Sequence, residues 1–254
     1  MLKQIYLLTF LSFFVLQNSN AQTKILPVKK LSKKKTFKKL EDAASRSNRV
    51  YSLYLLDKEL TPSDYELIKN MPNLQSVTFM FCKFTEKPTF LGELIQLQSL
   101  NINYCGLKEL PSEIGKLYNL LSLDLSGNEL VSLPPQMGSL KKLISLNLFL
   151  NKLENLPVQM DSLDSLKILN ISKNQLYTLP NVISEFDNLQ KLDLSYNPIY
   201  ALQTDVITVS EEFNKLKECL KLRKLILLSN NVIPVSFKNV ITKKLPLGSL
   251  VMFK

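Results

Sequence analysis

A fixed period runs through most of this chain and constrains its fold more than any other feature. Residues 120–130 read L-x-x-L-x-L-x-x-N-x-L, and the pattern returns every 23 residues from Leu74 to Leu189. A fixed period of about 20–50 residues indicates a solenoid, in which each unit packs only against its neighbours. Eight such units begin at Val50, Leu74, Leu97, Leu120, Leu143, Leu166, Leu189 and Leu222.

Each unit divides into a strand and a returning segment. Leu123 and Leu125 flank one polar residue, so both point into a core while Asp124 faces the other side of a short strand. Stacking these strands predicts a parallel sheet. A proline with a fixed φ then ends the extended run, and a short helical or 3₁₀ turn brings the chain back. These prolines are Pro111, Pro134, Pro157 and Pro180.

The ninth position of the units predicts a ladder of polar side chains. It holds Lys58, Cys82, Cys105, Asn128, Asn151, Asn174, Asn197 and Asn230. A buried amide has the donors and acceptors that the backbone needs where the chain leaves a strand. Two interpretations stand for Cys82 and Cys105: small buried thiols, or a disulfide between adjacent rungs, which a strand spacing of about 4.7–4.9 Å does not exclude.

With these motifs, residues 50–232 resemble the leucine-rich repeat proteins of the 23-residue type, whose returning half reads L-x-x-L-P-x-x-I-G-x-L-x-x-L. The resemblance implies an α/β solenoid: a right-handed horseshoe with a parallel concave sheet, about eight repeats and a cap at each end. Together with its N-terminal leader, the chain is similar to exported leucine-rich repeat proteins of bacteria.

The first 21 residues predict a signal peptide. Lys3 precedes an apolar run over 5–16, and Ser19-Asn20-Ala21 forms a small-residue cleavage pattern. The run is too short to cross a bilayer of about 30 Å as a helix. We therefore expect a soluble mature chain from about Gln22, secreted or held in the cell envelope (periplasm or cell surface), with no stable membrane insertion.

The positive charge is concentrated near the N-terminus. The chain has a formal net charge of +10. Eight lysines lie between residues 24 and 39, and no acidic residue precedes Glu41. One interpretation is an arm that seeks an anionic surface or nucleic acid. The favoured one is a solvated basic linker over 22–35; since only Phe37 is aromatic there, no nucleic-acid partner is predicted.

The remaining segments are interpreted as caps and an insertion. Helical spacing of Phe37, Leu40 and Ala44 predicts a capping helix over 36–49. Between repeats seven and eight, residues 204–220 are an insertion with two interpretations: a protruding element that adds contacts to a partner or, as favoured, a longer helix on the convex side. Its apolar face would hold Val209, Phe213, Leu216 and Leu220. Residues 233–254 form a C-terminal cap, with an incomplete ninth strand that includes Leu247, Leu250 and Met252.

The composition argues against catalysis. The chain has no His, which removes Ser-His-Asp and Cys-His chemistry and the commonest metal ligand. Among six Gly, no phosphate-binding loop motif occurs. Asp124 and Asp193 lie three repeats apart, on the order of 14 Å, which is too far for a paired acid/base site. Nothing near Cys219 would activate its thiol as a nucleophile. We predict no enzyme, no cofactor and no metal.

The outward positions of the strands favour a binding surface. A polar column runs through Tyr54, Thr78, Asn101, Asp124, Asn147, Asn170 and Asp193, with aromatic and apolar residues beside it. The predicted partner-binding residues are Tyr54, Met80, Phe81, Tyr104, Asp124, Phe149, Leu150 and Tyr196. Large exposed aromatic groups are enriched in binding hot spots. The alternative is that Phe81 and Leu150 only pack against neighbouring rungs.

The predicted function is therefore an exported, non-enzymatic, monomeric module that binds a protein ligand through its concave face. The alternative is a surface glycan or polymer, with Tyr54, Tyr104 and Tyr196 stacking on sugar rings beside Asn and Asp.

Overall fold

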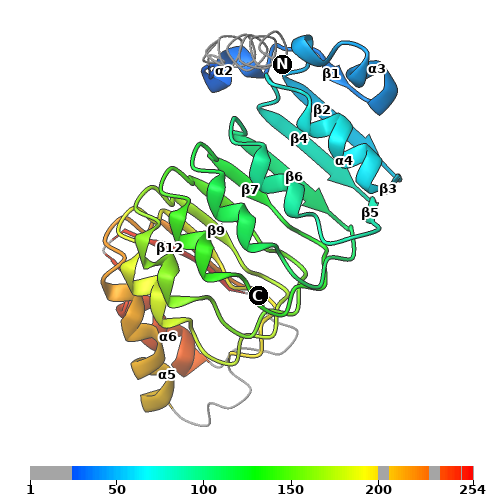
Figure 1. Cartoon of the computed structure of the whole chain (residues 1–254). Helices are drawn as coiled ribbons and strands as arrows, with labels where there is room; N and C mark the ends of the chain where they lie inside the picture. The colour runs from blue at the N-terminus through cyan, green and yellow to red at the C-terminus, as the bar shows by residue number, and fades with distance from the viewer. Residues whose placement is uncertain (1–24, 200–205, 229–234, 247, 254) are drawn as a thin grey trace, which may run out of the picture.

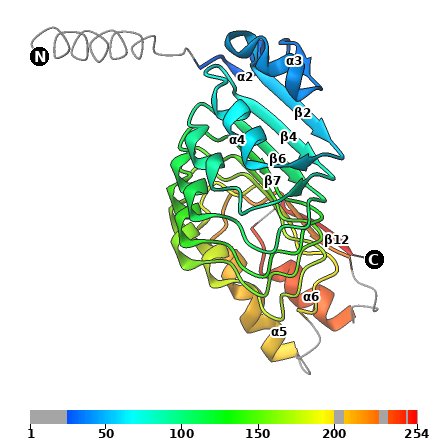
Figure 2. The same cartoon turned by 45° about the vertical axis from the view of Figure 1, so that its right-hand side comes forward.

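A computed structural model describes residues 25–199, 206–228, 235–246 and 248–253. They form a curved solenoid whose strands lie side by side from one end to the other, with helical turns on the opposite side (Figures 1 and 2). All strand pairs of the main sheet are parallel. The predicted right-handed α/β solenoid with a parallel concave sheet is confirmed. The predicted signal peptide, residues 1–21, lies outside the described ranges.

The main sheet has ten strands in the order β1-β2-β4-β6-β7-β8-β9-β10-β11-β12. Each repeat contributes one strand, and the two caps contribute β1 and β12. Equivalent positions pair, so Leu100 lies beside Leu123 and Asn101 beside Asp124. The strands are β1 (Thr36–Phe37), β2 (Ser52–Leu56), β4 (Ser76–Met80), β6 (Ser99–Asn103), β7 (Ser122–Asp124), β8 (Ser145–Asn147), β9 (Ile168–Asn170), β10 (Lys191–Asp193), β11 (Lys224–Leu227) and β12 (Leu250–Phe253).

The returning segments are mostly single 3₁₀ turns that follow the prolines. Pro111, for example, has φ −65° and directly precedes the turn Ser112–Lys116. This position agrees with the prediction that the proline ends the extended segment. The first repeat instead carries α4 (Pro62–Lys69). The 3₁₀ turns are η2 (Thr89–Glu93), η3 (Ser112–Lys116), η4 (Pro135–Ser139), η5 (Val158–Ser162) and η6 (Asn181–Glu185).

The Asn side chains form the predicted ladder. Asn128 Nδ2 donates to the carbonyl oxygens of Ile102 at 2.7 Å and Leu125 at 2.9 Å, and its Oδ1 accepts from the backbone N–H of Cys105 and Leu107. One buried amide therefore satisfies backbone groups of two repeats. Asn230 lies outside the described residues.

Cys82 and Cys105 replace the amide in two rungs, and both are free thiols. Cys82 Sγ donates to the Leu55 carbonyl at 3.4 Å, and Cys105 Sγ donates to the Phe79 carbonyl at 3.5 Å. A thiol supplies the donor but is a weak acceptor. Next to Cys82, a second sheet of β3 (Glu59–Leu60) and β5 (Lys83–Phe84) pairs the backbone of the first two repeats. Cys82 is buried as predicted, whereas Cys105 is partly exposed.

The N-terminal cap differs from the prediction. The single helix over 36–49 is wrong, because Thr36–Phe37 forms β1 and pairs with β2, and only then do α3 (Leu40–Ala44) and η1 (Ser47–Arg49) follow. Pairing covers the open edge of β2 while burying the Phe37 ring. The described part of the predicted linker, from residue 25, contains the short helix α2 (Val28–Leu31).

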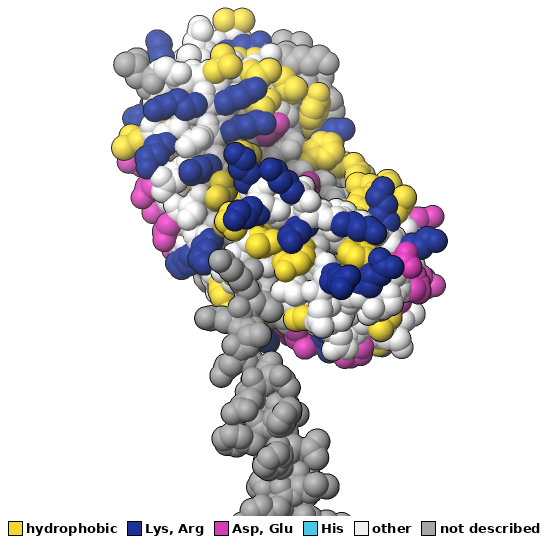
Figure 3. All heavy atoms as spheres, turned by 90° about the horizontal axis from the view of Figure 1, so that it is seen from above, with side chains coloured by type: hydrophobic (Ala, Val, Ile, Leu, Met, Phe, Trp, Pro, Cys, Tyr) yellow, Lys and Arg dark blue, Asp and Glu magenta, His cyan; other side chains and the backbone are white. Residues whose placement is uncertain are grey.

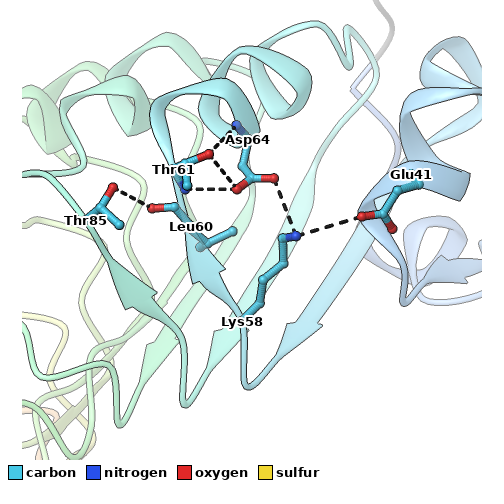
Figure 4. A network of polar contacts seen from close by, with 6 residues as sticks. All are labelled: Glu41, Lys58, Leu60, Thr61, Asp64 and Thr85. Atoms are coloured by element: carbon cyan, nitrogen blue, oxygen red, sulfur yellow. Dashed lines mark hydrogen bonds and ion pairs between the residues drawn. The ribbon is translucent and has the colours of Figure 1, made fainter.

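An ion-pair network joins this cap to the first repeat (Figure 4). Lys58 Nζ lies 3.8 Å from Glu41 Oε1 and 3.5 Å from Asp64 Oδ1. Asp64 also completes a capping box with Thr61, the N-cap of α4, whose backbone N–H donates to Asp64 Oδ2 at 2.9 Å. The Lys at the ladder position of the first repeat thus bridges a carboxylate of the cap and one of α4.

At the other end, the insertion forms α5 (Val206–Phe213) and η7 (Asn214–Lys217), and α5 packs against α6 (Val235–Lys243). Phe213 and Leu216 are buried as expected, but the prediction for Leu220 is wrong because this side chain is exposed. The side chain of Val209 lies outside the described part.

The predicted ninth strand forms as β12. Its register places Val251 beside Leu225, so Val251 and Phe253 pack against the core. Leu250 and Met252 are exposed. Leu247 lies outside the described residues.

Candidate functional site

A lane of short polar side chains runs along the concave sheet and is linked by hydrogen bonds between repeats. Asn101 Nδ2 donates to Thr78 Oγ1 at 2.9 Å, and Asn147 Nδ2 donates to Asp124 Oδ2 at 3.0 Å. Asp124 Oδ1 accepts from Asn103 Nδ2 and from the Ser126 N–H. Most of the hydrogen bonds of Asp124 therefore hold the lane together, and only its remaining lone pairs are left for another partner.

The eighth position of the first seven repeats has a left-handed backbone. Six non-glycine residues share it, with φ between 49° and 58°: Asp57, Phe81, Tyr104, Leu150, Lys173 and Tyr196. Bulky residues with positive φ are uncommon, and the left-handed conformation costs about 1–2 kcal/mol each. The solenoid thus maintains a row of mostly large side chains where Gly or Asn would be less strained.

Several of these side chains are exposed. Phe81 is 53% exposed, Tyr104 42% and Leu150 40%. The rings of Phe81 and Tyr104 stack with centroids 5.3 Å apart and planes 28° apart. Packing between rungs therefore does occur for Phe81, but it leaves about half of each residue of the pair exposed to solvent. Leu56, which the sequence interpretation missed, is also exposed on β2 and shares its repeat position with Met80 and Phe149.

Lys173 was missed as well, and it lies between two predicted site residues. Its Nζ is 5.4 Å from the centroid of the Phe149 ring and 5.6 Å from that of Tyr196. Both distances are within the range of cation–π attraction. Lys173 is the eighth residue of repeat six, the position that Tyr104 and Leu150 hold in their own repeats. This shared position could have identified it from the sequence.

The predicted residues fall into two clusters. Tyr54, Met80, Phe81 and Tyr104 form the first, in which Tyr54 Oη donates to Met80 Sδ at 3.3 Å. Phe149, Leu150 and Tyr196 form the second, together with Lys173. Repeat four lies between the clusters, with Asp124 in the lane and Gly127 at the eighth position, where the Tyr104 ring covers the glycine.

A family model described as a leucine-rich repeat region matches residues 81–220, more than half of the 254-residue chain. The chain belongs to the leucine-rich repeat family. Leucine-rich repeat proteins are generally binding modules, commonly for other proteins. A comparison with curated proteins finds no match.

Solved structures of other leucine-rich repeat proteins share the fold. A Leptospira interrogans leucine-rich repeat protein superposes with a TM-score of 0.61 at 23% identity, over 86% of this chain and 66% of that chain. The leucine-rich repeat domain of the type III effector XopL gives 0.59 at 21% identity, over 84% and 79%. At these identities, the likeness shows the fold alone.

A plant peptide hormone receptor, RGFR1 in complex with RGF2, is similar over part of its length. The TM-score is 0.52 at 26% identity, over 80% of this chain and 31% of that chain. This leucine-rich repeat chain therefore spans about a third of the receptor chain. None of the helices in the described ranges is long and apolar enough to cross a bilayer.

Proposed function

We propose that this protein is an exported leucine-rich repeat module that binds a protein or peptide ligand on its concave face. The observation that carries the proposal is the exposed, stacked pair of Phe81 and Tyr104, both in left-handed backbone. Exposed aromatic side chains that are already ordered lose little conformational entropy on binding. Strain maintained at surface positions suggests a use other than stability.

The two clusters suggest how a ligand would lie. One anchor would sit on Phe81 and Tyr104, and a second on Leu150 beside Lys173. Between them, repeat four has no large side chain of its own at the eighth position and offers Asp124 of the polar lane to the ligand backbone. Lys173 would favour an acidic group on the ligand, although the rings of Phe149 and Tyr196 already hold its charge in place. The structural relative RGFR1, a peptide hormone receptor in complex with RGF2, supports a peptide or protein as the ligand class.

We propose no catalytic role. The chain has no His, and among the described residues no group of three or more Cys, Asp or Glu is placed to hold a metal ion. Export and a monomeric state are parts of the proposal that rest on the sequence.

The test is affinity capture with the full chain from its native source, followed by quantitative binding of the isolated partner. The variant Phe81→Ser with Tyr104→Ser should weaken binding at least about tenfold. The control pair is Tyr118→Ser with Tyr177→Ser, which removes aromatic side chains of 52% and 48% exposure outside the strands. Equal affinity of the folded concave variant and the control would contradict the proposal.

A glycan is the second candidate, favoured by the lane of Asn and Asp side chains beside Tyr104. Tyr54 suits it less, because this ring is half-buried and its hydroxyl donates to Met80. A glycan array probed with the full chain separates the two ligand classes: binding that Tyr104→Ser abolishes would support the glycan, and a blank array would exclude the sugars tested.

A further inference from the structure

The charge of this protein is concentrated on its N-terminal cap. Residues 25–49 contain nine Lys and Arg and two acids, a net charge of +7 (nine minus two), whereas residues 50–254 contain 21 Lys and Arg and 20 acids, a net charge of +1. The basic residues of the cap are Lys29, Lys30, Lys33, Lys34, Lys35, Lys38, Lys39, Arg46 and Arg49. The repeats are thus nearly neutral and the cap is strongly cationic.

These cations are exposed and largely uncompensated. All nine side chains are exposed, and among the described residues no ion pair joins any of them to a carboxylate. Glu41, one of the two acids, instead faces Lys58 of the first repeat at 3.8 Å. Seen from above the N-terminal end, Lys and Arg gather across the face and Asp and Glu lie mostly at its margin (Figure 3).

The basic segment is fixed to the solenoid at several points. The Leu26 N–H donates to Gln75 Oε1 at 2.9 Å, and Gln98 Nε2 donates to the Leu26 carbonyl at 2.7 Å. Leu31 and Phe37 are buried in the cap. The lysines between them therefore occupy one end of a rigid body, and their charges act together on whatever approaches that end.

Apolar side chains lie beside the lysines. Val28 is 56% exposed and Ile25 is also exposed, next to Lys29 and Lys30. Cationic side chains around a few exposed aliphatic groups suit the interface of a bilayer, where the charges meet anionic headgroups and the aliphatic groups enter the acyl boundary. Nucleic acid fits less well, since the one aromatic ring of residues 25–49, Phe37, is buried and cannot stack on bases.

We propose that the N-terminal cap docks on a membrane surface rich in acidic phospholipid, with the lysines against the headgroups and Val28 and Ile25 at the acyl boundary. Each Lys near such a surface contributes about 1 kcal/mol, and the attraction falls off within about 10 Å at 0.1 M salt. Docking by this end leaves the concave face free, so this surface is independent of the ligand site.

The test is co-sedimentation of the full chain with phosphatidylcholine vesicles that contain or lack phosphatidylglycerol, at about 0.05 M and about 0.5 M NaCl. The variant Lys33→Glu, Lys38→Glu, Lys39→Glu reverses three exposed charges of the cap. Its control, Lys116→Glu, Lys141→Glu, Lys217→Glu, reverses three exposed charges on the repeats and has the same net charge. Thermal melts by circular dichroism verify that both variants fold.

We expect the wild type and the control to bind the acidic vesicles at low salt, with at least about tenfold weaker partition for the cap variant and for the wild type at high salt. Three results would overturn the proposal: equal binding to both vesicle types, equal loss in the cap variant and the control, or tighter binding to duplex DNA than to acidic vesicles. Apolar adsorption of residues 1–24 adds to the bound fraction with both vesicle types, so the difference between the two isolates the effect of the acidic lipid.

Discussion

The ring of Tyr104 lies directly over the Cα of Gly127 in the next repeat. A Cβ built on Gly127 would be 2.8 Å from Cγ of that ring, closer than real contacts allow, and Gly127 itself has φ +70°. The glycine therefore serves two purposes: it adopts the left-handed turn and makes room for the aromatic side chain. The same Tyr104 ring stacks on the Phe81 ring, so the contact with Gly127 is part of the packing of the first cluster.

Gly127→Ala should displace the Tyr104 ring as well as strain the turn. Gly106→Ala is the matched control, since Gly106 has φ +67° but nothing lies within 4 Å of its built Cβ. We expect Gly106→Ala to cost about 1 kcal/mol of unfolding free energy and Gly127→Ala distinctly more. Urea unfolding measures both, and equal costs would contradict the contact.

The ladder predicts an order of stability at Asn151. This amide donates to the carbonyls of Leu125 and Leu148 and accepts from the Leu130 N–H. Asn151→Cys keeps a donor, as Cys82 does in its own rung, while Asn151→Ala keeps nothing. We expect Ala to cost about 2–4 kcal/mol and Cys less, because each unsatisfied buried group costs about 1–3 kcal/mol. Denaturant unfolding of both variants measures the two losses of stability. A larger loss for Asn151→Cys than for Asn151→Ala would contradict the role of the amide as a donor.

Asp64 should make the cap sensitive to acid. Burial raises the pKa of this carboxyl, but hydrogen bonds from the backbone and side chain of Thr61 and the charge of Lys58 outweigh it, so the net pKa is lowered. A carboxyl with a lowered folded pKa adds stability above its unfolded value, near 4, which is lost as the pH falls through the folded value.

Asp64→Asn should therefore destabilise the protein by about 1 kcal/mol near neutral pH, and the difference from wild type should shrink as the pH drops below about 4. Thermal melts of both proteins across this pH range measure the difference. A difference that stays constant with pH would show that the carboxylate charge does not contribute.

The thiols of the ladder should be reduced in the folded protein. Cys82 and Cys105 each donate to a backbone carbonyl, and Cys219 Sγ donates to the Ile183 carbonyl at 3.2 Å. We expect all three thiols to react with a thiol reagent after unfolding without reductant. If only one thiol reacts, and the protein mass is lower by two hydrogens, the disulfide between Cys82 and Cys105 on adjacent rungs is supported instead.

Much of the fold follows from the period, because inward leucines at fixed spacing leave one way to stack. The strands, the Asn ladder and the proline stops were all predictable on that basis. The cap was not: Thr36–Phe37 is too short to show a strand pattern, and its helix-like spacing with Leu40 concealed the pairing with β2. The two Gln that hold Leu26 belong to positions that the repeat leaves free.

The candidate site was predictable in position but not in geometry. The eighth position of the repeat identified Phe81, Tyr104 and Leu150, yet a repeat pattern carries no information on the sign of φ, so the left-handed row was not foreseen. Lys173 was passed over because a lone Lys at a free position looks like any solvated charge. Only the placement of Phe149 and Tyr196 on either side of its Nζ distinguishes it.

The central claim is that the concave face contacts the ligand, and site-specific photocrosslinking tests it most directly. A photoreactive phenylalanine analogue is placed at position 104, or at position 118 as the control, and the full chain is irradiated in its native environment. We predict a discrete adduct from position 104 and none from position 118. Adducts from position 118 alone would contradict the claim and move the binding surface away from the sheet.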